Sequence, residues 1–272
     1  MFLTFSKQKV YYEKYGDKEK IILILPGWGN TRKTFKYLIE SLKEEYTIYI
    51  LDYPGEGNSS IPKTDYTVYD YVLIIKKLIK KEKINISYII AHSFGGRLAA
   101  ILISKEKIPV EKLVLMDVAG IKRREKGKVF IKEKIYKLLK KVLIFLPKKV
   151  QKKAREKLLS FFASPDYKNL PPIMHKTFQN IIHENIKKYY QEIKTETLII
   201  WGEKDEDTPL KDAYLLRKII KNSELIIYKN SNHFSYLDYP NQTISIINFF
   251  LLQSAHENDS HDQIEKKNQP TS

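Results

Sequence analysis

Short apolar runs alternate with longer amphipathic stretches along most of the chain. The runs at Ile21–Leu25 and 46–51 are rich in Ile, Leu and Tyr and contain no charged residue. Uninterrupted apolar runs of this length are typical of strands that are buried on both faces of a parallel sheet. We predict strands at 9–15, 21–25, 46–51, 86–90, 112–116, 197–201 and 224–228.

The stretches between these runs have apolar residues at helical spacing. We predict helices at 35–43, 69–79, 95–104, 210–220 and 242–252. Strands and helices that alternate in this way form right-handed crossovers on a parallel sheet. The sequence therefore predicts the α/β class, with a mostly parallel, doubly wound sheet.

The alternation is interrupted once, over residues 121–193. This segment has basic, helical sequence without a convincing strand, and prolines such as Pro147, Pro165 and Pro171 divide it into short helices. We therefore expect a core of residues 1–120 and 194–254 and a helical cap insertion of residues 121–193. The polar residues 255–272 have almost no apolar side chains and are predicted to be a disordered tail.

Composition narrows the possible chemistry. The chain has 272 residues, of which 43% are hydrophobic, so it can bury a sizeable core. It has no cysteine, which excludes disulfides, thiolate metal sites and cysteine nucleophiles. Neither a secretory signal nor an apolar run long enough to span a membrane stands out, so a cytoplasmic location is expected.

The net charge of +16 is concentrated in the insertion. Residues 122–157 contain 16 Lys and Arg and three Glu, a net charge of +13. Within them, residues 135–146 have the pattern of an amphipathic helix with a basic polar face. A cap helix with its lysines in water would explain this pattern, and so would a helix that also makes weak contact with an anionic membrane. We expect no nucleic-acid partner, because no RNA-binding motif accompanies the charge.

Candidate chemistry begins at Ser93, between a predicted strand and a predicted helix. Ala91 and Gly95 flank it as the small residues that a tight nucleophile elbow needs. In that geometry the backbone N–H of Phe94 would point to where an oxyanion develops. The alternative is an ordinary serine that caps a helix.

An acid and a base follow at the ends of two later strands. Asp205 and Asp207 come just after the strand at 197–201, and His233 comes just after the next strand. The carboxyl ends of parallel strands share one edge of a sheet, where Ser93 is also expected. A histidine can deprotonate a serine hydroxyl, and a carboxylate can orient the imidazole. His92 is too close to Ser93 along the chain to serve as its base.

Together these motifs resemble the α/β-hydrolase superfamily, over about residues 9–253. The stretch of residues 25–30 resembles the loop that supplies a second oxyanion N–H, which would be that of Trp28, although Pro26 stands where a His is usual. Residues 52–59 resemble a D-x-P-G-x-G-x-S loop, to which we assign no catalytic role. The register from Gly202 favours Asp205 over Asp207. The insertion is similar to those of uncharacterised hydrolases of low-GC Gram-positive bacteria.

The resemblance implies a serine hydrolase that forms an acyl-enzyme through Ser93, His233 and Asp205. We expect a carboxylesterase acting on small or medium acyl esters, with a small-molecule acyl substrate as its partner and no cofactor. The same residues would serve a thioesterase, an aminopeptidase or a C–C hydrolase, and a non-catalytic binding protein is a further alternative. No His, Asp and Glu cluster has metal-ligand spacing, so no metal is expected. His175 and His183 in the insertion are candidates for lining the pocket.

Overall fold

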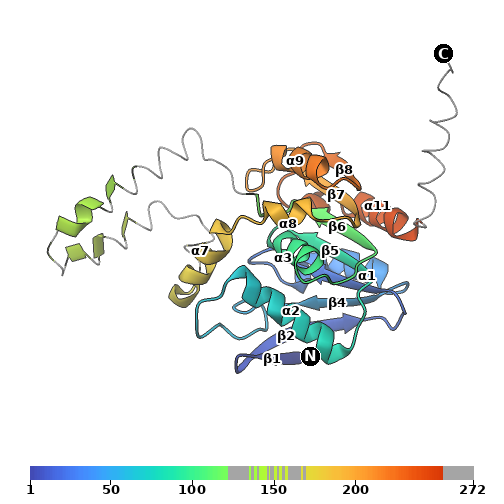
Figure 1. Ribbon diagram of the computed structural model, residues 1–272, viewed down its shortest axis with the longest axis horizontal. Helices are drawn as coiled ribbons and strands as arrows, with labels where there is room; N and C mark the ends of the chain where they lie inside the picture. Colours follow the sequence, from blue (N-terminus) through green and yellow to red (C-terminus); the bar gives the residue numbers. More distant parts are fainter. Residues whose placement is uncertain are drawn as a thin grey trace, which may run out of the picture.

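The central element of the computed structural model is one eight-stranded sheet, with the strand order β1-β2-β4-β3-β5-β6-β7-β8 (Figure 1). The structure describes residues 1–121 and 170–253 and, between them, residues 135, 138–139, 141–145, 147, 150–151, 153–154, 157–158 and 167. The strands are β1 (Phe2–Phe5), β2 (Gln8–Tyr15), β3 (Ile21–Leu25), β4 (Thr47–Leu51), β5 (Tyr88–His92), β6 (Lys112–Met116), β7 (Glu196–Gly202) and β8 (Ser223–Tyr228).

Most of the sheet is parallel, as predicted. From β4 to β8 every neighbouring pair runs in the same direction, whereas β2 pairs antiparallel with both β1 and β4. The sequence patterns did not identify β1, which is a four-residue strand at the edge of the sheet.

The helices and short 3-10 turns connect these strands. Those of the core are η1 (Arg32–Phe35), α1 (Lys36–Leu42), α2 (Val68–Glu82), α3 (Phe94–Ser104), α9 (Lys211–Ile219), α10 (Ser235–Asp238) and α11 (Pro240–Leu252). Helix α2 begins at a reciprocal capping box, in which Thr67 and Asp70 satisfy each other's backbone N–H groups. This box explains why the helix starts immediately after residue 67.

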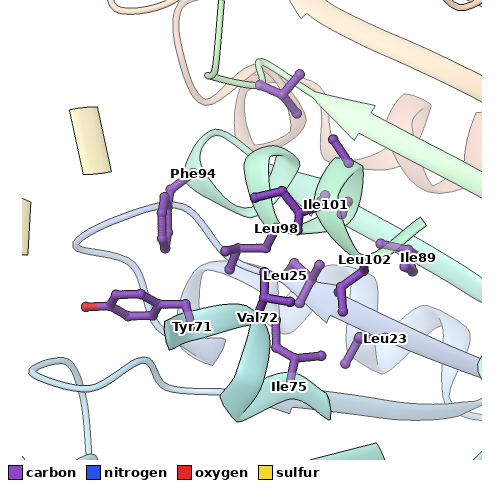
Figure 2. Packing of buried hydrophobic residues seen from close by; sticks show 14 of the residues in the cluster. Leu23, Leu25, Tyr71, Val72, Ile75, Ile89, Phe94, Leu98, Ile101 and Leu102 are labelled. Carbon is purple, nitrogen blue, oxygen red and sulfur yellow. The ribbon is translucent and has the colours of Figure 1, made fainter. Parts of the chain in front are cut away.

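The two faces of the sheet have separate hydrophobic cores. Along β3, Leu23 and Leu25 pack with α2 and α3, whereas Ile22 and Ile24 pack with α1 and α11. Figure 2 shows the first of these cores, with Tyr71 and Phe94 at one end of the aliphatic cluster. Because β3 is buried on both faces, its sequence has no polar alternation, and this confirms the basis on which the strand was predicted.

The predicted insertion lies between β6 and β7. Its described part contains η2 (Leu143–Phe145), η3 (Pro172–Met174), α7 (His175–His183) and α8 (Lys187–Gln191), and no strand. The remaining residues of the predicted cap, and the predicted tail 255–272, lie outside the described residues. Among the described helices, none is long and apolar enough to cross a membrane.

Helix α7 packs on the loops at the carboxyl edge of the sheet. The hydroxyl of the fully buried Thr177 accepts the Tyr66 N–H at 2.9 Å, and the Asn180 side chain donates to the Tyr66 carbonyl at 3.1 Å. The Phe178 ring lies 5.6 Å from that of Trp28, measured between centroids. The described part of the insertion thus touches the loop that was predicted to carry an oxyanion donor.

Candidate functional site

Ser93 lies in a sharp turn between β5 and α3. Its φ of 48° and ψ of −113° are unfavourable for a residue with a side chain. A Cβ on Gly95 would lie 2.0 Å from the Leu25 carbonyl oxygen, so only glycine fits there. The Ser93 hydroxyl makes no capping hydrogen bond to α3, which argues against an ordinary helix cap. The turn instead directs the hydroxyl away from its own helix.

The three residues selected from the sequence meet at this turn. The distance from His233 Nε2 to Ser93 Oγ is 2.9 Å, and that from His233 Nδ1 to Asp205 Oδ2 is 2.8 Å. They follow three different strands, and the carboxyl ends of those strands share one edge of the sheet. A hydrogen-bonded chain from hydroxyl to imidazole to carboxylate is the arrangement that activates a serine.

The carboxylate of Asp205 is buried and fully occupied by donors. Its Oδ1 accepts the backbone N–H groups of Asp207 and Thr208, and its Oδ2 accepts the Thr208 hydroxyl at 2.6 Å. Asp207 is exposed, and Asp205 is the acid that touches the imidazole. Thr208 was not identified from the sequence, and it helps to fix the carboxylate that faces His233.

The two neighbouring histidines have opposite electrostatic environments. Burial lowers the pKa of His233, but the hydrogen bond and negative charge of Asp205 outweigh burial and raise its pKa above the ordinary value. Burial lowers the pKa of His92 to about 3, so its ring is neutral near neutral pH. His92 Nε2 lies 2.8 Å from the His233 carbonyl oxygen and therefore carries the proton that it donates there. His92 packs beneath the base instead of acting as one.

The loop at Trp28 lies beside the start of α3. The rings of Trp28 and Phe94 are in edge contact, with centroids 5.7 Å apart. Within the described residues, the backbone N–H groups of Trp28 and Phe94 donate no hydrogen bond. An oxyanion hole requires two such free N–H groups near the nucleophile, and the Trp28 loop does approach it, because a Cβ on Gly27 would lie 3.1 Å from the Ser93 Cβ.

Glu56 supports this loop from the neighbouring D-x-P-G-x-G-x-S segment. Its Oε1 accepts the Gly29 N–H at 2.7 Å, and Gly29 has a φ of +74° in the turn after Trp28. Burial raises the pKa of Glu56 to about 8. In the same segment the buried Asp52 pairs with Arg32 at 2.8 Å. The segment is thus a structural support, and the contact from Glu56 to Gly29 was not predicted.

Asp117, directly after β6, is a further acid at this edge that the sequence reasoning left out. It is fully buried, and its carboxylate accepts N–H or O–H groups from Gly202 and Ser235. Its position in the sequence could have identified it, because Asp117 directly follows the predicted strand at 112–116, just as Asp205 follows the predicted strand at 197–201.

Metal-binding potential at this edge is limited. In the described part of the chain, Asp205, Asp207 and His233 have potential ligand atoms within 4.8 Å of one another. Both ring nitrogens of His233 and both carboxylate oxygens of Asp205 already take part in hydrogen bonds. The arrangement therefore fits proton transfer better than metal ligation.

The remaining histidines lie away from this network or outside the described residues. The His175 ring stacks on Tyr167, with centroids 4.1 Å apart, and His183 is exposed at the end of α7. His256 and His261 belong to the tail outside the described residues.

Comparison with known proteins identifies the architecture. The family described as alpha/beta hydrolase fold matches residues 20–165. Lipase 1 of Psychrobacter immobilis is 26% identical over 253 residues, which cover 85% of this chain and 76% of the lipase. The sequence resemblance to this superfamily is therefore confirmed.

Solved structures show the same fold. An alpha/beta hydrolase from a Medee basin deep-sea metagenome library superposes with a TM-score of 0.73 at 21% identity, covering 94% of this chain and 99% of that one. An esterase from Exiguobacterium antarcticum superposes with a TM-score of 0.70 at 23% identity, covering 93% and 99%.

Proposed function

The chain belongs to the alpha/beta hydrolase fold family, and on this premise we propose that it is a serine carboxylesterase that cleaves small or medium acyl esters. The observation that carries the proposal is the continuous contact from Ser93 Oγ through His233 to Asp205, with distances of 2.9 and 2.8 Å. An esterase-like hydrolase also agrees with the names of its relatives, which include lipases and an esterase.

In the proposed first step, Ser93 Oγ attacks the ester carbonyl carbon while His233 Nε2 takes the hydroxyl proton. The tetrahedral intermediate collapses, the alcohol leaves with that proton, and an acyl group remains on Ser93. Water then attacks the acyl carbon and gives a proton to His233, which passes it to Ser93 Oγ as the bond to the acyl group breaks and the carboxylic acid leaves. Asp205 stabilises the imidazolium in both halves and holds the tautomer with Nδ1–H.

The negative charge on the tetrahedral oxygen would rest on the N–H groups of Trp28 and Phe94. Each such donor is typically worth about 3 kcal/mol of the activation barrier. The contact from Glu56 to Gly29 supports this part of the proposal, because it fixes the turn that follows Trp28.

The surroundings of Ser93 favour an apolar acyl group. The rings of Trp28, Tyr71 and Phe94 lie in mutual edge contact, and Phe178 of α7 adjoins Trp28. Trp28 is the partly exposed ring of this group, and aromatic side chains with a few polar groups are typical of sites for small organic ligands.

The proposed location of the protein is the cytoplasm.

A chain-length series of p-nitrophenyl esters tests the proposal. The purified protein should hydrolyse acetate to octanoate esters, and Ser93→Ala should lose this activity by several orders of magnitude while keeping its fold. Near-wild-type turnover by Ser93→Ala would exclude this residue as the nucleophile. A folded wild-type protein that cleaves no ester but does cleave thioesters, anilides or C–C bonds would contradict the esterase proposal. It would show that the same three residues serve a thioesterase, an aminopeptidase or a C–C hydrolase.

A further inference from the structure

Asp117 adjoins all three loops that meet at the site. The backbone on both sides of Asp117 is hydrogen-bonded to Ser93. The Ser93 N–H donates to the Met116 carbonyl at 3.1 Å, and the Ala119 N–H donates to the Ser93 carbonyl at 3.0 Å. The segment around Asp117 is therefore held against the turn that carries the candidate nucleophile.

The side chain of Asp117 contacts the two other loops. Its Oδ1 accepts the Gly202 N–H at 2.8 Å, at the end of β7 and three residues before Asp205. Its Oδ2 accepts both the backbone N–H and the hydroxyl of Ser235, two residues after His233. We propose that Asp117 is a positioning residue, which fixes the loops of Asp205 and His233 relative to the turn of Ser93.

A carboxylate suits this position better than any neutral side chain. All three groups that reach its two oxygens are donors, so the ionised carboxylate, in which both oxygens accept, satisfies all of them. The side chain is fully buried, and its φ of 47° lies in the left-handed region, which Asp and Asn tolerate better than most residues. The amide of an Asn would place an N–H group against another donor on one side.

The two loops also contact each other directly. The Lys204 N–H donates to the Ser231 carbonyl at 2.8 Å, and the Asn230 N–H donates to the Glu203 side chain at 2.9 Å. These bonds join the acid loop to the histidine loop, but they do not join either loop to Ser93. His92 joins only the histidine loop to the Ser93 turn, whereas Asp117 joins both loops to it, since its backbone adjoins Ser93 and its side chain holds the other two.

The charge of Asp117 also affects the pKa of His233, the proposed base. Burial raises the pKa of Asp117 to about 7, against the effect of its donors, and Asp205 raises it further while His233 lowers it. Tyr228 and Tyr236 are the other titratable groups that face it. Conversely, the negative charge of Asp117 contributes to the raised pKa of His233. Removal of that charge should lower the apparent pKa of the base.

The proposal rests on the proposed esterase function and is tested by steady-state kinetics of Asp117→Asn. A displacement of about 1 Å in a catalytic group can reduce the rate about 100-fold. We therefore expect the plateau kcat on a p-nitrophenyl ester to fall about 10- to 100-fold, with KM within about twofold. The acidic limb of the kcat/KM profile should move to lower pH. A role in stability alone would leave both kinetic quantities unchanged in the folded fraction.

Asp207→Asn is the matched control. Asp207 is an exposed acid whose charge also raises the pKa of His233, but its side chain joins no loops. Its variant should show a small shift of the acidic limb and a plateau kcat within about twofold of the wild-type value. If folded Asp117→Asn has the same plateau kcat as Asp207→Asn, the positioning role is wrong.

Ser235→Ala covers the case in which Asp117→Asn does not fold. This variant removes one donor and leaves the buried carboxylate in place, so its kcat should fall about three- to tenfold with KM unchanged. An unaltered kcat in Ser235→Ala would then overturn the proposal. A wild-type protein inert to every ester and to fluorophosphonate would overturn the esterase function itself, whereas an active wild type with unaffected variants overturns the positioning role alone.

Discussion

At the scale of single residues, the contact between Asp205 and His233 decides which acid acts. Asp205→Asn should leave the imidazole in the wrong tautomer and reduce kcat by up to ~10⁴-fold. Asp207→Asn should have a mild effect, because the Asp207 carboxylate does not hydrogen-bond to the imidazole. Ester hydrolysis by the two variants, measured side by side, checks this prediction. A larger loss in Asp207→Asn would mean that the register from Gly202 is wrong.

The buried carboxyl of Glu56 should make stability depend on pH. Burial raises its pKa from 4.5 to about 8. Between these values the folded protein holds a proton that the unfolded chain has released, so the free energy of unfolding falls as the pH rises. Glu56→Gln keeps an oxygen for the Gly29 N–H and does not ionise. The variant should therefore gain stability relative to wild type as the pH rises from about 5 to about 8.

Urea unfolding at several pH values measures this difference. The exposed Glu206→Gln variant serves as the control, and its stability should follow the wild-type pH dependence. Parallel curves for Glu56→Gln and wild type would show that Glu56 is already ionised near neutral pH and would contradict the prediction.

At the scale of elements, the contact between α7 and the loop before α2 is one of the described links from the insertion to the core. Thr177→Val removes the acceptor of the Tyr66 N–H from a buried position. An unsatisfied buried donor typically costs about 1–3 kcal/mol, so the free energy of unfolding should fall by that amount. Thr177→Ser keeps the hydroxyl and should lose less. Equal losses in the two variants would show that the methyl group, and not the hydrogen bond, stabilises this contact.

Element patterns also explain how much of the fold could be predicted from the sequence. The bounds of β3 and β6 were predicted residue for residue, because strands buried on both faces have long apolar runs, to which β6 adds only Lys112 at its start. β1 was missed because it is four residues long and only one of its side chains is fully buried. Short edge strands carry too few patterned positions to stand out.

The candidate site could be predicted in part for a related reason. Ser93, Asp205 and His233 each follow a strand, so the parallel sheet alone implies that they share an edge. Asp117 follows a strand too, but its partners are backbone N–H groups and a serine that no spacing singles out. Glu56 reaches Gly29 across 27 residues of sequence, through a turn whose geometry the residue types did not specify.

At the scale of the whole molecule, the uneven charge suggests a surface partner. Residues 122–157 have a net charge of +13, and several described side chains in this region are large, apolar and exposed. These are Ile135, Leu138, Leu139, Val142, Ile144, Phe145 and Val150. Apolar side chains among lysines are typical of surfaces that bind anionic membranes. We therefore propose weak contact with anionic lipid through this segment.

Co-sedimentation with phosphatidylglycerol vesicles tests this proposal. Binding should be detectable at low salt, fade as salt shortens the screening length to about 8 Å at physiological ionic strength, and be absent with phosphatidylcholine. Phe145→Ser should weaken it, whereas Phe249→Ser on α11 should not, although both side chains are exposed. No binding at low salt would contradict the membrane proposal and favour the other interpretation of the segment, a cap whose lysines are in water.

The central claim is that Ser93 is a nucleophile activated by His233, and covalent labelling tests it most directly. A fluorophosphonate reacts with an activated serine and needs the same base as ester hydrolysis. Wild-type protein should be labelled at a single site, which peptide mass spectrometry should locate at Ser93. Ser93→Ala should not be labelled, and His233→Gln should react far more slowly. A folded wild-type protein that remains unlabelled, or one labelled at another residue, would contradict the account.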